Sequence, residues 1–334
     1  MKLKRIGMLF SAVCLGFALT ACGSSVANTE GNAVDESAKT TLSIAYQYGT
    51  AYSPLAIAME KGLIENAYKE ATGNELSINW IQMTKGADIN TGIASGDIDA
   101  GFMGTAPAIT GCLKGAGYKI FTNLSGQEQA LHTNNENIHS LADIIGSSEQ
   151  IALVNNGSIQ HIALAMALAD NGYDSHALDS NIVVMSHPDG QTALESGSIA
   201  CHLTSSPYIY EERNNDTLYE LSEVSNSWSV DNSFIVGVAS ENLHSNHSEI
   251  YNALCRGISD AIDFINEHPT EAADITYLFN GTSQADEFFY IGAGSFSSET
   301  HNLVKIAQFM ADNGFIDETE ITKEALTFDN VLGD

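Results

Sequence analysis

The order of short apolar runs and helical segments constrains the fold of this chain most. From residue 42 onward, strand-like runs alternate with segments that have apolar residues at helical spacing. Strict alternation of this kind is typical of α/β architecture with a mainly parallel sheet. We expect strands at 42–47, 76–83, 100–103 and 119–124, and helices at 54–68, at 87–95 and from 106 onward.

A second series with the same alternation begins near residue 127. It has expected strands at 150–154, 182–186 and 200–205, and helices at 158–171 and 191–195. After residue 205 the sequence turns helical and stays so. The helices there are expected at 250–265, 270–279 and 302–313, the second directly after Pro269, which breaks the first, and the third stopped by Gly314.

Two α/β units followed by a helical third indicate two lobes with two chain crossings between them. We place the crossings at 126–131 and 226–234. Lobe 1 is then discontinuous and consists of 41–126 plus 235–334, and lobe 2 is 127–234.

The N-terminus has the pattern of a bacterial export signal. A positive region at 2–5 precedes an apolar run at 6–19, which is too short for a stable membrane span. The run ends in LTAC at 19–22, which resembles the lipobox of bacterial lipoproteins. We therefore predict a signal peptide at 1–21 and a lipid on the sulfur of Cys22. Such an anchor would place the protein on the extracytoplasmic face of the cell membrane.

The segment that follows is polar and lacks aromatic residues. Residues 22–40 are rich in Ser, Asn, Ala and Gly, and they cannot bury enough apolar surface to fold. We interpret them as the lipidated cysteine and a flexible tether.

The chain is strongly acidic, with a formal net charge of −29. Nucleic acid needs a basic face, so the charge argues against nucleic-acid binding. It also disfavours docking of the protein surface on anionic lipid, which leaves membrane attachment to the anchor.

Five blocks, in order, resemble the type II periplasmic-binding-protein-like proteins of the sulfonate, taurine and nitrate importers, the NMT1/THI5-like group. The blocks are AMEKGLIE at 58–65, GDIDAGFMGTAPA at 96–108, GSIQH at 157–161, ALESG at 193–197 and AIDFINEHP at 261–269. The resemblance covers nearly everything after residue 41. It implies two α/β lobes with a ligand cleft between them, and an ABC permease and its ATPase as partners. We also expect no cofactor and a monomeric protein.

Two strand-to-helix junctions are candidates for the ligand site. In open α/β sheets, ligands lie beyond the carboxyl ends of strands, where helix N-termini present free N–H groups. The junctions are Gly104-Thr105-Ala106 in the first lobe and Asn156-Gly157-Ser158 in the second, with Gln160 in the following turn. Two facing helix starts could hold a sulfonate, phosphonate or carboxylate. Ordinary N-capping is the alternative role for the Thr and Ser hydroxyls.

The remaining cleft residues are expected at other strand ends and at the crossings. These candidates are Gln47, Tyr48, Tyr52, Ser53, Ser125, Gln127, Gln191, Ser205, Ser206 and Trp228. For Tyr48 and Trp228, packing at the hinge is an equal alternative to ligand contact.

The basic residues lie mostly away from these junctions, with Lys85 and Arg213 as possible exceptions. A multiply charged anion would usually require an Arg fork. Its absence favours a singly charged sulfonate held by N–H groups, or a neutral heterocycle held by aromatic and amide groups. We expect sulfonate binding to survive Lys85→Ala and Arg213→Ala.

The ligand classes are ranked by these features. An aliphatic sulfonate or taurine comes first, a thiamine-type pyrimidine or other heterocycle second, and nitrate or bicarbonate third. An enzyme is a weaker alternative, because the sequence has no Gly-x-Ser-x-Gly, P-loop or His-Glu-x-x-His motif. His161 could in principle be catalytic, but a packed or ligand-facing imidazole is the simpler interpretation. A metal site is not expected, since His244 and His247 have no third ligand nearby in the sequence.

Overall fold

The computed structural model describes residues 40–318 and 321–333. The predicted signal peptide, Cys22 and nearly all of the tether lie outside the described residues. In the described part, no helix is both long enough and apolar enough to cross a membrane.

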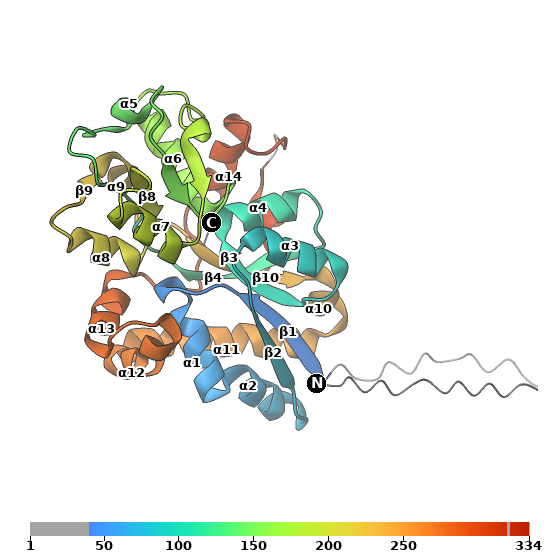
Figure 1. Ribbon diagram of the computed structural model, residues 1–334. Coiled ribbons are helices and arrows are strands. Elements are labelled where there is room, and N and C mark those ends of the chain that lie inside the picture. Colours follow the sequence, from blue (N-terminus) through green and yellow to red (C-terminus); the bar gives the residue numbers. More distant parts are fainter. Residues whose placement is uncertain (1–39, 319–320, 334) are drawn as a thin grey trace, which may run out of the picture. The chain divides into compact units, whose positions relative to one another are not determined.

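Two five-stranded sheets form the centres of two α/β lobes (Figure 1). The first sheet has the order β2 (Ser77–Gln82), β1 (Thr41–Tyr46), β3 (Ala100–Gly104), β10 (Ile235–Ser240) and β4 (Tyr118–Ser125). β2, β1 and β3 are parallel, and β10 lies antiparallel between β3 and β4. The carboxyl ends of β1, β2, β3 and β4 therefore meet at one edge of the sheet.

The second sheet repeats this arrangement. Its order is β7 (Ile182–Val184), β6 (Ile151–Leu153), β8 (Cys201–Thr204), β5 (Ala130–Thr133) and β9 (Tyr219–Leu221). Here β7, β6 and β8 are parallel, and β5 is the antiparallel strand between β8 and β9. In each sheet the antiparallel strand is the first one that the chain forms after it arrives from the other sheet.

The alternation expected from the sequence is confirmed, but the expectation of only helices after residue 205 is wrong. The chain forms β9 and then β10 before it becomes helical. β10 reads IVGVAS, and its residues from Ile235 to Ala239 are all buried. A short strand buried on both faces has no alternation of polar and apolar residues, so periodicity could not separate it from a helix.

Helices cover both sheets. In the first lobe they are η1 (Thr50–Tyr52), α1 (Ser53–Lys61), α2 (Leu63–Thr72), α3 (Gly86–Ser95), α4 (Thr105–Leu113), α10 (Glu241–Asn246), α11 (Ser248–Glu267), α12 (Pro269–Asn280) and α13 (Gln284–Ala293). In the second lobe they are α5 (Leu141–Ile144), α6 (Ile159–Asp170), η2 (Asp179–Asn181), α7 (His187–Glu195), α8 (Tyr208–Arg213) and α9 (Ser222–Ser227). The last two, α14 (Leu303–Asp312) and α15 (Lys323–Leu326), follow the first-lobe helices in the chain.

The single helix expected at 54–68 is two helices. Gly62 has φ 58° and ends α1 in the left-handed conformation, and α2 begins at the next residue. A residue with a Cβ would be strained there, so this glycine sets the break between the two helices.

The hydrophobic cores of the two lobes meet at α6. Ile159, Ile162 and Ala163 of this second-lobe helix pack in the same cluster as the core of the first sheet. Another cluster lies on the second sheet and includes Leu131 and Leu203. Because the start of α6 packs on the first lobe, the two strand-to-helix junctions predicted to face each other do lie side by side.

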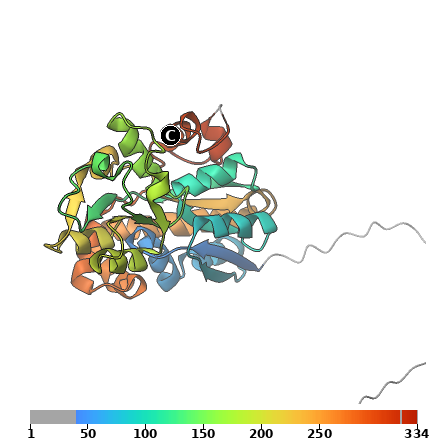
Figure 2. The ribbon, with the colours of Figure 1, turned by 45° about the horizontal axis from the view of Figure 1, so that its top comes forward.

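The C-terminal region also contacts both lobes. α14 packs on α4 (Figures 1 and 2). Phe315, which follows α14, contacts the ring of His161 in α6 edge-on. His176 Nε2 lies 2.6 Å from the carbonyl oxygen of Asn313. The chain after residue 300 therefore forms a further connection between the lobes, besides the two crossings.

Candidate functional site

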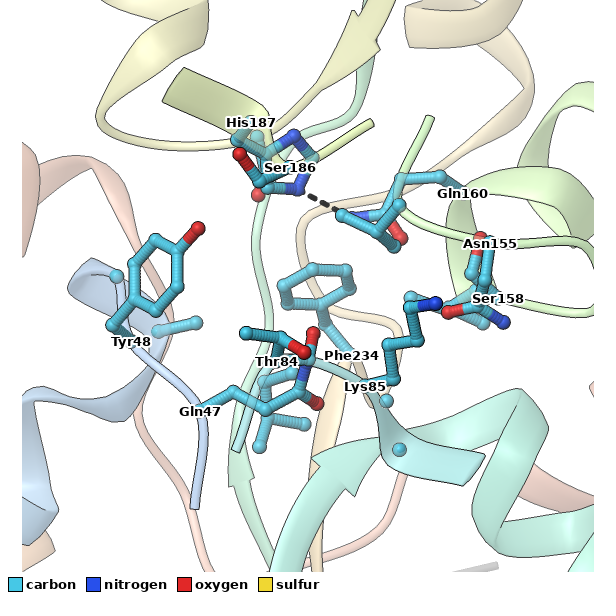
Figure 3. A pocket seen from close by; sticks show the side chains of 18 of the residues that line it. Gln47, Tyr48, Thr84, Lys85, Asn155, Ser158, Gln160, Ser186, His187 and Phe234 are labelled. Carbon is cyan, nitrogen blue, oxygen red and sulfur yellow. Dashed lines mark hydrogen bonds between the residues drawn. The ribbon is translucent and has the colours of Figure 1, made fainter. Parts of the chain in front are cut away.

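A cavity of about 370 Å³ lies where the carboxyl ends of the strands in the two sheets approach each other. Its walls come from the residues that follow β1, β2, β3, β6, β7 and β8, and from the start of β10. A volume of this size is enough for a small organic molecule. Figure 3 shows polar side chains of both lobes around it.

The first-lobe wall is built on the segment after β1. The side-chain amide of Gln47 donates to the carbonyl of Thr84 (3.0 Å) and its oxygen accepts from the hydroxyl of Tyr52 (3.1 Å). These bonds fix the amide. The ring of Tyr48 projects toward Ser186 of the second lobe (Figure 3). Burial raises the pKa of Tyr48, the Ser186 hydroxyl opposes this rise, and Asp189 adds to it.

Lys85 brings a positive charge to the same wall. It is the N-cap residue of α3, and its side chain extends toward Asn155 and Ser158 of the second lobe (Figure 3). Within residues 40–318 and 321–333, none of the ion pairs involves Lys85. Its ammonium group is thus available to an anion in the cavity.

The second-lobe wall contains the starts of two helices. Ser158 caps α6, and its hydroxyl accepts from the backbone N–H of His161 (3.2 Å). Ser186 caps α7, where its hydroxyl accepts from the N–H of Asp189 and donates to the carboxylate of Asp189 (2.6 Å). Both helix starts direct partial positive charge toward the cavity.

Ser206 provides an unused polar group in the same wall. Its side chain is 5% exposed, and its hydroxyl has no hydrogen-bond partner in the described part of the chain. A buried hydroxyl without a partner is costly, and a ligand in the cavity could satisfy it.

The structure brings about half of the predicted site residues to the cavity. Those that line it are Gln47, Tyr48, Tyr52, Gly104, Ser158, Gln160, Ser205 and Ser206. Those outside its lining are Ser53, Thr105, Ala106, Ser125, Gln127, Asn156, Gly157, Gln191 and Trp228.

Several of the outlying residues have structural partners. The Thr105 hydroxyl donates to the carbonyl of Ser233 (2.6 Å), so it ties α4 to the segment that leads into β10. The Trp228 indole N–H donates to the carbonyl of Gln127 (2.9 Å) and the ring is buried. For Trp228 the contacts are those of the hinge-packing alternative.

The others have hydrogen-bond partners elsewhere, or are exposed or covered. Ser53 donates to the buried carboxylate of Glu287 (3.2 Å), and Gln191 donates to Glu211 (2.8 Å). The N–H of Gly157 donates to His161 Nδ1 (3.0 Å). Asn156 is exposed, while Ala106 and Ser125 are fully buried.

The sequence reasoning missed several lining residues, three of them at the start of α7. These are Thr84, Asn155, Ser186, His187, Asp189, Tyr208 and Phe234, while Lys85 had been named only as a possible exception. The helix expected at 191 begins at His187. The pattern Ser186-His187-Pro188-Asp189 could have predicted this start. A Ser that is followed three residues later by an acidic residue, with Pro in the first turn, is typical of a helix N-terminus.

His161 and the other histidines do not form a metal site. His161 Nδ1 accepts from Gly157 and its Nε2 lies 2.9 Å from Asp179 Oδ1, so both ring nitrogens are used inside the lobe. In the described segments, no group of three or more His, Cys, Asp or Glu side chains could hold a metal ion.

Comparison with solved structures shows the class of fold. The alkanesulfonate-binding protein SsuA of Xanthomonas axonopodis pv. citri, bound to MOPS, superimposes with TM-score 0.70 at 17% identity, over 89% of this chain and 99% of that one. The periplasmic aliphatic sulphonate binding protein SsuA of Escherichia coli gives 0.67 at 16% identity, over 88% and 93%. The ligand-binding component of an ABC-type import system from Staphylococcus aureus, with zinc bound, gives 0.69 at 13% identity, over 86% and 96%. The fold is that of the two-lobed periplasmic binding proteins.

The family follows from the sequence itself. Residues 35–278 match the model of the NMT1-like family, and the chain belongs to that family. A search of the curated proteins gives no significant match.

Proposed function

We propose that this protein is the solute-binding component of an ABC importer and that it takes a small organic anion, such as an aliphatic sulfonate or taurine, into the interlobe cavity. The solved structures that share its fold include sulfonate-binding proteins and a component of an ABC-type import system. An ABC permease and its ATPase would be its partners. The protein would act as a monomer and without catalysis.

One observation supports an anion as the ligand. The capped start of α6, the capped start of α7 and the ammonium group of Lys85 lie around one cavity. Two helix starts and one lysine can neutralise a single negative charge, but there is no Arg fork in the cavity lining for a multiply charged anion. Asp189 at the rim adds a negative charge, which further disfavours a dianion.

The same cavity supports a capture mechanism. Its walls belong to both lobes, so a ligand inside would contact both and favour the closed state by its extra contacts there. We assign lobe 1 to 41–126 plus 235–334 and lobe 2 to 127–234. This division is supported by the membership of the two sheets. The hinge would then include Gln127 and Trp228.

We also propose that Cys22 carries a lipid that anchors the protein to the extracytoplasmic face of the membrane. The LTAC motif at 19–22 supports this assignment. Mass spectrometry of the protein expressed in a bacterial host, compared with Cys22→Ala, tests it. A lipid-sized mass difference is expected on the wild type and should be absent from the variant.

A thermal-shift panel tests the ligand class. We expect alkanesulfonates to raise the melting temperature in proportion to RT ln(1 + [L]/Kd), whereas sulfate and phosphate leave it unchanged. The matched variants are Lys85→Ala in the cavity wall and Lys114→Ala at an exposed site outside it. A panel in which no organic anion shifts the transition would contradict the proposal.

A neutral heterocycle is the second candidate. The aromatic side chains of Tyr48, Tyr208 and Phe234 line the cavity and could contact a planar ring. A thiamine-type pyrimidine belongs in the same panel. If it raises the melting temperature and the sulfonates do not, the cavity binds rings and not anions.

A further inference from the structure

A chain of buried polar side chains leads from the cavity into the second lobe. His187 at the cavity wall lies with its Nδ1 3.3 Å from Nε2 of His202. Nδ1 of His202 in turn lies 2.5 Å from Oε1 of Glu212. The other oxygen of Glu212 is 2.9 Å from Nδ1 of His132. His202, Glu212 and His132 are at most 1% exposed.

The positions of the protons along this chain follow from its inner end. The two histidines lower the pKa of Glu212 against the opposing effect of its burial, so Glu212 is ionised and can only accept hydrogen bonds. His202 therefore carries a proton on Nδ1, which it donates to Glu212. We assign the proton of His187 to Nδ1 as well, on the side of Thr204 and His202, which leaves a lone pair on Nε2, the nitrogen on the cavity side.

The contacts of His187 agree with this assignment. Its Nδ1 is also 3.0 Å from the hydroxyl oxygen of Thr204, which accepts the same proton and can donate its own to the carbonyl of Ser205. On the cavity side, Nε2 lies 3.5 Å from the amide nitrogen of Gln160, a donor (Figure 3). Burial, with His202 nearby, lowers the pKa of His187 to about 3, so the ring is neutral near pH 7.

Close packing of α7 on β8 keeps the two histidine rings in contact. At Gly190 a Cβ atom would lie 2.7 Å from His202 Nε2, so only glycine lets the helix approach this strand so closely. The Ser186 cap fixes the first turn of the helix, which contains His187. The orientation of His187 is thus set by the backbone as well as by its hydrogen bonds.

We propose that His187 determines specificity by presenting a fixed hydrogen-bond acceptor to the ligand, and that the ligand carries an N–H or O–H donor in addition to its anionic group. The anionic group would lie at Lys85 and the start of α6, with the donor at His187, Tyr48 and Asp189. This inference rests on the proposed function, because it concerns the same cavity.

Long-range ¹H–¹⁵N NMR of the ¹⁵N-histidine-labelled protein tests the proton positions without any ligand. His187→Gln assigns the signals, and His139→Gln at an exposed site is the control. We expect His187 and His202 to be protonated on Nδ1. Protonation of His187 on Nε2 would overturn the inference, whatever the cavity binds.

Paired ligands of equal size test the specificity. In calorimetric titrations, 2-aminoethanesulfonate and 2-hydroxyethanesulfonate should bind about tenfold more tightly than propane-1-sulfonate, since a ligand donor would replace the long 3.5 Å contact from the Gln160 amide to His187 Nε2 with a shorter hydrogen bond. In His187→Phe the preference should fall to within about twofold, while His139→Gln should keep it. Equal affinities in the wild type would refute the role of His187. Failure of all three sulfonates to bind would contradict the proposed function, and the NMR result would still decide the proton positions.

Discussion

The two lobes share one strand order but differ in what they bury. The interior of the first lobe is a large apolar cluster that includes Leu42, Ile44 and Phe102. The second lobe has a smaller apolar cluster and, beside it, the buried pair of His202 and Glu212. The difference indicates a division of roles, in which the second lobe orients a recognition group through buried polar contacts, whereas the first-lobe groups at the cavity, such as Tyr48 and Lys85, lie beside an apolar core.

Deleting one buried group in each lobe should separate these roles most clearly. Glu212→Ala leaves two buried histidine rings without their carboxylate, and we expect the free energy of unfolding to fall by about 3–5 kcal/mol. Phe102→Ala should cost a similar amount, about 3–5 kcal/mol, through the cavity that it leaves. Urea denaturation measures both. Only Glu212→Ala should also change the preference between donor-bearing and donor-free sulfonates, so a change of preference in Phe102→Ala would contradict the division.

The two basic residues singled out in the sequence should differ in their effect on binding. Lys85→Ala should weaken sulfonate binding by up to about tenfold, since one exposed charge is lost while both helix starts remain. Arg213 pairs with Glu128 and Glu220, at 2.7 Å from each, and does not line the cavity. Arg213→Ala should therefore leave the dissociation constant unchanged in the same titration. Complete loss of binding in Lys85→Ala would show that the helix starts do not hold the anion.

The hinge should affect stability and not recognition. Trp228→Phe keeps most of the buried ring and removes the hydrogen bond to the Gln127 carbonyl, which should cost about 1 kcal/mol of unfolding free energy. Ligand affinity should stay within about twofold by calorimetry. A larger loss of affinity would indicate that Trp228 contacts the ligand.

The contact between the second lobe and the C-terminal region should depend on pH. The pKa of His176 is raised, first by its hydrogen bond with the Asn313 carbonyl and then by Asp179. Because the folded state holds this proton more tightly, the stabilisation is complete below the ordinary pKa of about 6.5 and is lost as the pH rises through the raised value. Melting temperatures of the wild type and His176→Gln should therefore converge at alkaline pH. A difference in melting temperature that stays constant across the pH range would show that the protonated His176 ring does not stabilise the fold through its contact with Asn313.

Much of the architecture could be predicted from the sequence, since strands and helices with clear periodicity, such as β2 and α11, follow from their own residues. β10 could not, because a strand buried on both faces lacks a periodic pattern. The division of the helix at Gly62 depended on one left-handed glycine within an otherwise continuous pattern.

The candidate site was predictable only where it sits at strand ends. Gln47, Tyr48 and Ser206 follow strands, and the rule for open sheets placed them near the cavity. His187 was missed because the start of α7 was expected four residues too late. Its link to His202 and Glu212 is a tertiary contact between α7, β8 and α8, and no local pattern encodes it.

Calorimetric titration of the purified protein with 2-aminoethanesulfonate tests the central claim most directly. We predict one binding site with a dissociation constant in the low micromolar range or below, competed by 2-hydroxyethanesulfonate and retained in Arg213→Ala. No detectable binding of either compound, with melting temperatures unchanged by both, would contradict the claim that the cavity between the lobes captures a small organic anion.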